Sequence, residues 1–112
     1  MVNKPKIRGT AWETACVNAL KRAGWVHAER RALHGNVDKG DLAGLPGVVA
    51  EMKDCKSLTF GPWLKEALLE RDNAGADIGF VWAKRRGHPL PEDGFVITDG
   101  STFMRLLKEA GY

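Results

Sequence analysis

Apolar side chains recur three and four positions apart in three stretches of the chain, which is the spacing of one face of a helix. These stretches are residues 10–23, 62–72 and 100–110. Gly24, Gly75 and Gly111 follow them closely, as glycines do at helix ends. The pattern therefore predicts three helices. The first is opened by a capping box, with Thr10 at the N-cap and Glu13 three positions further on.

Short runs rich in Val, Ile and aromatic residues separate the helices and predict strands. They are residues 25–31, 48–53, 77–84 and 95–98. The run 77–84 is strongly apolar, which is typical of a central strand that is buried on both faces. A hairpin partner before residue 48 adds one more strand. This order predicts an α/β domain with a mixed central β-sheet of about five strands flanked by helices.

One stretch carries the candidate chemistry and predicts a β-hairpin, because Leu-Pro-Gly at residues 45–47 is a turn signal between two short apolar runs. Side chains alternate along a strand, so the odd-numbered residues of 49–53, Glu51 and Lys53 among them, share one face and the even-numbered residues take the other. With the turn centred on the proline, Asp41 lies directly opposite Glu51, with Cβ atoms about 5 Å apart.

Two carboxylates at that distance repel each other unless a cation lies between them. Hard oxygen ligands without His or Cys at the pair suit Mg²⁺ or Mn²⁺ better than Zn²⁺. The triplet of an acidic residue, any residue and a lysine is a weak signal by itself. Chance predicts about one such triplet in a chain of this composition, and the chain has two, at residues 51–53 and 54–56. Only the first closes an apolar run as a strand would. On the triplet alone, an ion pair on a solvated strand face is the favoured alternative.

The size and composition of the chain fit a single domain with a modest core, since 44% of its 112 residues are hydrophobic and 28% are charged. We expect a flexible basic arm at residues 1–8 and one domain at residues 9–112. No apolar run approaches the length of about 18 residues that a membrane span needs, and no signal peptide is visible. A cytoplasmic location is therefore expected. Cys16 and Cys55 are expected to be free thiols.

The net charge of +3 favours an acidic partner such as nucleic acid. The basic groups expected to contact DNA phosphates precede the first helix, surround the hairpin and follow the central strand. They are Lys4, Lys6, Arg8, Arg30, Arg31, His34, Lys39, Lys56, Lys84, Arg85 and Arg86. A charge run is usually just solvated, and this alternative stays open. The histidines lack metal-ligand spacing, and His34 is also a candidate for proton transfer.

Three positions combine into a recognisable motif: Glu13 in the first helix, Asp41 at the strand tip, and Glu51-Met52-Lys53 on the next strand. With them, the chain resembles the PD-(D/E)XK nuclease superfamily, and more closely the small Holliday-junction resolvases of archaea and phages. The phrases Gly-Thr-Ala-Trp-Glu-Thr-Ala and Gly-Asp-Leu-Ala-Gly-Leu-Pro-Gly-Val-Val are similar to mycobacteriophage resolvases in particular. The likeness covers residues 8–112. If a phage encodes the protein, as this likeness implies, the expected cytoplasm is that of the host cell. It departs at Gly40, where the motif has a proline that shapes the chain and binds nothing.

The resemblance implies a restriction-endonuclease-like nuclease core that hydrolyses DNA phosphodiester bonds with Mg²⁺, for which Mn²⁺ substitutes. Asp41, Glu51 and the Met52 carbonyl would bind the metal, and Glu13 would bind it directly or through water. Lys53 would orient the attacking water and help to deprotonate it. The products would be a 5′-phosphate and a 3′-hydroxyl. From the residues alone, Glu13 serves equally well as the helix cap.

Cutting a four-way junction requires two active sites and the chain has one, so a resolvase implies a homodimer with two-fold symmetry. Its partner would be branched DNA, and no membrane is involved. Within enzymes, the alternative is a nuclease of the same fold that acts on flaps, nicks or other branched DNA. Outside enzymes, the alternative is a non-catalytic DNA-binding domain. The intact set of Asp41, Glu51 and Lys53 argues against that alternative.

Overall fold

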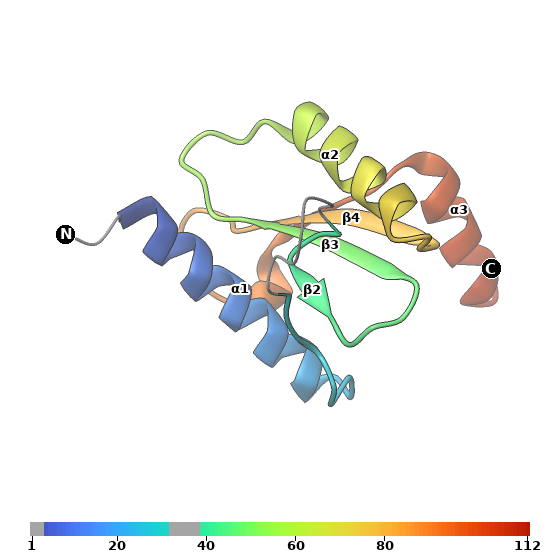
Figure 1. Ribbon diagram of the computed structural model, residues 1–112, viewed down its shortest axis with the longest axis horizontal. Helices are drawn as coiled ribbons and strands as arrows, with labels where there is room; N and C mark the ends of the chain where they lie inside the picture. The colour runs from blue at the N-terminus through green and yellow to red at the C-terminus, as the bar shows by residue number, and fades with distance from the viewer. Residues whose placement is uncertain (1–3, 32–38) are drawn as a thin grey trace.

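Three α-helices and two small sheets make up the part of the chain that the structure, a computed structural model, describes, which is residues 4–31 and 39–112 (Figure 1). The helices are α1 (Lys4–Arg22), α2 (Phe60–Asn73) and α3 (Gly100–Glu109). The strands are β1 (Glu29–Arg30), β2 (Leu42–Ala43), β3 (Val48–Lys53), β4 (Ile78–Ala83) and β5 (Phe95–Ile97). A short 3-10 helix, η1 (Pro91–Asp93), precedes β5. The expected α/β class is confirmed.

The strands form two separate sheets, so the expected single sheet of five strands is wrong. In the larger sheet, β4 lies in the middle, parallel to β3 and antiparallel to β5, which confirms it as the central strand. In the smaller sheet, β1 and β2 pair antiparallel, with Arg30 opposite Leu42. Each of these two strands has only two residues, which is too short to extend the ladder of β3. The stretch 25–31 is a turn and irregular chain up to Ala28, and its strand is limited to Glu29–Arg30.

The expected hairpin of residues 40–53 exists as a turn but not as a regular ladder. The N–H of Val48 donates to the carbonyl of Leu45 at 3.2 Å, which closes the turn, whereas β2 pairs with β1 and not with β3. Gly44 accounts for this pairing. It has a φ of +87°, and a Cβ at this position would collide with the carbonyl of His27. Only glycine lets the two chain segments approach this closely.

The helices α1 and α2 cover opposite faces of the larger sheet (Figure 1). The core on the α1 side includes Trp12, Cys16, Val17, Ala50, Met52 and Trp82. The core on the α2 side consists of Ala67, Val81 and Ala83, with Phe60, Trp63, Leu64 and Ile97 packed against it. The even-numbered residues of β3 therefore face α1, and Lys53 contacts α2 through Glu66. This confirms the alternation expected along β3.

Two buried tryptophans tie α1 to the sheet. The indole N–H of Trp12 donates to the carbonyl of Trp82 at 3.0 Å, and the indole N–H of Trp82 donates to the carbonyl of Pro91 at 2.9 Å. Each ring is thereby buried with its one polar atom satisfied, which is how tryptophan is normally accommodated in a core. The pair fixes the position of α1 along β4, and with it the position of Glu13.

Helix α1 begins at Lys4, six residues before Thr10, so the expected capping box is wrong. Thr10 lies inside the helix, and Glu13 therefore has no N-terminal N–H to cap. Pro5 falls in the first turn, where a missing N–H costs nothing, so the residues before Thr10 extend the helix. The helix includes residues 4–8, for which a flexible arm is expected from the sequence.

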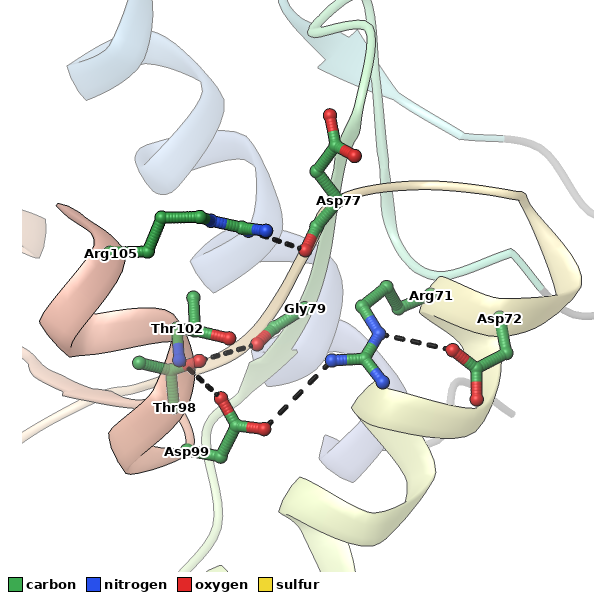
Figure 2. A network of polar contacts seen from close by, with 8 residues as sticks. All are labelled: Arg71, Asp72, Asp77, Gly79, Thr98, Asp99, Thr102 and Arg105. Carbon is green, nitrogen blue, oxygen red and sulfur yellow. Dashed lines mark hydrogen bonds and ion pairs between the residues drawn. The ribbon is translucent and has the colours of Figure 1, made fainter. Parts of the chain in front are cut away.

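Helix α3 is confirmed at its expected position and is joined to the sheet by polar contacts (Figure 2). Asp99 is its N-cap, with a side chain that accepts a hydrogen bond from the N–H of Thr102 at 2.9 Å. The Asp99 carboxylate also lies 3.9 Å from the guanidinium of Arg71 on α2. The hydroxyl of Thr98 donates to the carbonyl of Gly79 on β4 at 2.8 Å. Among the described residues, none of the helices has both the length and the apolar character needed to cross a bilayer.

Candidate active site

Asp41 lies against the outer edge of β3, beside Glu51. Its main-chain N–H donates to the carbonyl of Ala50 at 2.9 Å. Its side-chain Oδ2 accepts a hydrogen bond from the N–H of Met52 at 2.8 Å. The two bonds bracket Glu51, so the structure brings Asp41 to the place expected from the sequence. The carboxylate here takes the position that a neighbouring strand's carbonyl would occupy, because β2 does not continue alongside β3.

The environment of Asp41 disfavours its charge. Burial, followed by the nearby carboxylates of Glu51 and Glu13, raises the pKa of Asp41 to about 7, although the Met52 N–H and the Lys53 ammonium act in the opposite direction. Glu51 itself is only 4% exposed. A buried carboxylate next to other carboxylates is stabilised by a proton or by a nearby cation, and such a raised pKa is a recurring property of functional sites.

Lys53 is held by acidic groups from two elements. Its Nζ lies 3.4 Å from Oε2 of Glu51 on β3 and 3.5 Å from Oε2 of Glu66 on α2. It also lies 5.9 Å from the centre of the Trp63 ring. Burial by itself would lower the pKa of Lys53, but Glu51 and Glu66 outweigh burial and the pKa is raised. The lysine is therefore a stable ammonium at neutral pH.

Glu66 and Glu70 are site residues that the sequence reasoning missed. Carboxylate oxygens of Glu51, Glu66 and Glu70 lie within 4.8 Å of one another. Glu70 is 2% exposed, and a Cβ on Gly40 would come within 3.5 Å of its Oε2, so the chain that leads into Asp41 passes next to it. The available signal was their spacing of four residues on one helix, which puts both on the same face.

Glu13 belongs to this acidic environment but has a cation of its own. Its Oε2 lies 2.9 Å from Nη2 of Arg30, a residue that is expected from the sequence to contact DNA. Glu13 still contributes to the raised pKa of Asp41. The buried thiol of Cys16 lies close to the same two carboxylates. Its pKa is raised well above the usual range, first by burial and then by the charges of Glu13 and Asp41. Both Cys16 and Cys55 are free thiols, as expected.

The donor set around Asp41 fits a hard divalent cation. Asp41 and Glu51 supply carboxylate oxygens, and the charge of Glu51 raises the pKa of Asp41, which is the repulsion that a cation between them would relieve. The N–H and C=O of one strand residue project to the same side, so the Met52 carbonyl points to the edge where Asp41 lies. All three donors are oxygens, which suit Mg²⁺ or Mn²⁺. The cluster of Glu51, Glu66 and Glu70 is less suited, because the Lys53 ammonium already contacts two of its members.

A basic pocket adjoins the site at the carboxyl ends of β3 and β4. The N–H of Lys84 donates to the carbonyl of Lys53 at 2.9 Å, which joins the segments that follow the two strands. The pocket has a volume of about 390 Å³. Its lining consists of Arg8, Asp54, Cys55, Lys56, Lys84, Arg85, Arg86 and Gly87. Five of the basic residues expected from the sequence to contact DNA thus gather from three separate parts of the chain.

The remaining expected DNA contacts do not gather at this pocket. Arg31 uses its Nε to donate to the carbonyl of Leu42 at 3.2 Å, and Arg30 pairs with Glu13. Lys39 is exposed, Lys4 and Lys6 fall in the first turn of α1, and His34 lies outside the described residues. His27 and His88 are exposed.

Comparisons with known proteins give no match: no family model, no curated protein and no solved structure corresponds to the chain. Membership of the PD-(D/E)XK superfamily, and of the resolvases within it, therefore stays a prediction from the sequence.

Proposed function

We propose that the protein is a metal-dependent endonuclease that hydrolyses phosphodiester bonds in branched DNA, with the four-way junction as its substrate. The observation that carries this proposal is the convergence of Asp41, Glu51 and Lys53 beside a pocket lined by five basic side chains. Oxygen ligands next to a lysine are the groups that phosphodiester hydrolysis uses, and a cationic pocket attracts a polyanion.

Asp41, Glu51 and the Met52 carbonyl would hold Mg²⁺, or Mn²⁺ in its place. The bound metal would supply an activated water and stabilise charge on the phosphate. Lys53 is charged and lies on the same strand, two residues from Glu51. Its ammonium would orient the attacking water and offset the negative charge that builds on the scissile phosphate. Glu13, held by Arg30 on the side of α1, lies close enough to raise the pKa of Asp41 and would bind the metal directly or through water.

The basic pocket would bind the phosphates next to the cleaved bond. It starts one residue after Lys53, so a DNA backbone lying across the ends of β3 and β4 would reach both. Such contacts position DNA without reading its sequence, and they make binding depend strongly on salt. Two cuts related by symmetry would require two chains, so the proposal includes a homodimer.

A cleavage assay tests this function directly. A synthetic four-way junction and a linear duplex built from the same arms are each incubated with the protein, in Mg²⁺ and in EDTA, beside the Asp41→Asn variant. The proposal expects paired symmetric nicks in the junction only, lost in EDTA and in the variant. A flap and a nicked duplex are included as further substrates, and cutting of these at the same rate as the junction would indicate a broader nuclease activity in place of junction specificity. Tight junction binding without cleavage in any metal would identify a non-catalytic DNA-binding domain.

A further inference from the structure

The side chain of Lys53 contacts acidic groups of two elements, Glu51 on β3 and Glu66 on α2. Glu51 contacts it at 3.4 Å, but Glu51 is also a ligand in the proposed metal site and its charge would be shared with the metal. The second contact, Glu66 at 3.5 Å, comes from α2 and belongs to no other part of the proposed chemistry. The Trp63 ring, one helical turn before Glu66, lies 5.9 Å from the ammonium. Two groups of α2 therefore flank the lysine on the side away from β3.

The helix that carries Glu66 is held at a fixed distance from the sheet. Ala67, the next residue, is fully buried against β4, and a Cβ on Gly79 would lie only 2.8 Å from its carbonyl oxygen. Glycine at 79 therefore allows the main chains of α2 and β4 to approach as closely as they do. Arg71, one turn further on, reaches Asp99 at the start of α3 (Figure 2). The carboxylate of Glu66 is thus presented by a helix with little freedom to shift.

From this geometry we infer that Glu66 is a positioning residue, which keeps the Lys53 ammonium in place for the cleavage step. The inference rests on the proposed function. A lysine side chain has four rotatable bonds, so a single contact leaves its ammonium many positions, and a second contact from a rigid helix removes most of them. Misplacement of a catalytic group by even about 1 Å is costly to a rate. Glu66 acts through Lys53 and need not touch DNA or metal.

The first measurement needs neither DNA nor metal. The side-chain CH₂ groups of lysine are followed by NMR in protein labelled at lysine, and the Lys53 signal is assigned from its loss in Lys53→Arg. The Trp63 ring should shift that signal, because the ammonium lies 5.9 Å from the ring. Glu66→Gln should reduce the shift, and Glu66→Asp should reduce it less. An unchanged shift in Glu66→Gln would overturn the inference, since Glu66 would then not hold the lysine.

The second measurement is the single-turnover rate of junction cleavage in saturating Mg²⁺. Glu66→Gln should lower this rate by about tenfold with unchanged junction affinity, and Glu66→Asp should recover part of the loss. Glu109→Gln, which removes the same charge from the exposed end of α3, is the matched control and should cleave at the wild-type rate. A wild-type rate in Glu66→Gln would overturn the inference while leaving the nuclease intact. Absence of cleavage by the wild type would overturn the proposed function and the role of Glu66 in it, while the NMR result would still show whether the contact exists.

Discussion

The main-chain N–H of Met52 and the carboxylate of Asp41 are joined by a hydrogen bond of 2.8 Å. The bond holds Asp41 against the strand that carries Glu51, so the two carboxylates stay close although the segments that bear them do not form a regular ladder. A side chain thus replaces a missing strand at the edge of β3.

Asp41→Asn and Glu51→Gln should each reduce junction cleavage by at least about 100-fold, because each removes a charged ligand from the proposed metal site. Asparagine retains an oxygen that can accept the Met52 hydrogen bond, so the fold should survive. Binding to the junction in Ca²⁺, which supports no cleavage, should also survive. Asp72→Asn, on the exposed side of α2, is the matched control. Full activity in either site variant would contradict the assignment of the site.

The stability of the metal-free protein should decrease as pH rises from about 4 to about 7. The folded pKa of Asp41 is raised from 3.8 to about 7, so in this window the folded state holds a proton that the unfolded chain has lost. Stability falls with pH wherever the folded state binds more protons, and this contribution levels off above the folded pKa. Urea unfolding at a series of pH values measures it. Asp41→Asn should show a shallower decrease, and identical slopes in the two proteins would show that Asp41 is not the group responsible.

Glu13→Gln should leave the free energy of unfolding within about 1 kcal/mol of the wild type, because its ion pair with Arg30 is partly exposed and it caps no helix. If the Glu13 carboxylate binds the metal, the cleavage rate should fall strongly while the free energy of unfolding changes little. Arg30→Gln is the matched variant, since it breaks the same pair and leaves the carboxylate. Equal cleavage in the two variants would assign the effect to the ion pair and not to the carboxylate.

Removing charge from the basic pocket should weaken junction binding and flatten its dependence on salt. Lys56→Gln and Arg86→Gln are the best choices, because both residues are exposed. Lys84 lies 3.9 Å from Asp54, and Arg85 donates to the carbonyl of Asp93, so changes there would also disturb the fold. Each lost phosphate contact should reduce the slope of log affinity against log salt by about 0.9. Lys108→Gln on α3 is the control. If the pocket variants showed the same slope of log affinity against log salt as this control, the basic side chains of the pocket would be solvated charges that do not contact DNA.

Asp99→Ala should destabilise the protein by about 1 kcal/mol, the usual cost of losing an N-cap. Hydrogen bonds from Thr102 and the charge of Arg71 lower the pKa of Asp99. A lowered pKa gives stability that is complete above the unfolded value near 3.8 and is lost as pH falls through the folded value. The difference in unfolding free energy between the two proteins should therefore shrink below about pH 4. Asp99→Asn, which can still cap, should lose less than Asp99→Ala at neutral pH.

Local patterns predicted the local structure well. The apolar spacing of α2 and α3 and the continuous apolar run of β4 gave elements at the right places, because their burial is determined by their own sequence. The start of α1 was wrong, since a capping box is a local preference that residues before Thr10 override by extending the helix. The grouping of strands was also wrong, because it depends on the approach of Gly44 to His27, and these residues are far apart in the chain.

The candidate site shows the same division. Asp41, Glu51 and Lys53 could be found because they fall on one short stretch with a recognisable alternation. In the sequence alone, Glu66 and Glu70 cannot be told from ordinary charged residues on the exposed face of a helix. Their role depends on how α2 is rotated about its axis when it packs on β3 and β4, which is set by contacts such as Ala67 against Gly79. The basic pocket likewise needs α1 to bring Arg8 to the ends of two strands.

The hydrogen bond from Trp12 to Trp82 spans 70 positions of the chain, and this has a consequence for synthesis in the cell. Helix α1 leaves the ribosome first, yet the carbonyl that receives its indole N–H belongs to β4 and emerges much later. Until then the indole N–H of Trp12 lacks its acceptor, and α1 can be helical without being docked on β4. Contacts of such long sequence separation form late and slow the folding of a domain. The carboxylates of Glu13 and Asp41 are therefore brought together only when nearly the whole chain has been made, so an incomplete chain carries the residues of the site but not the site.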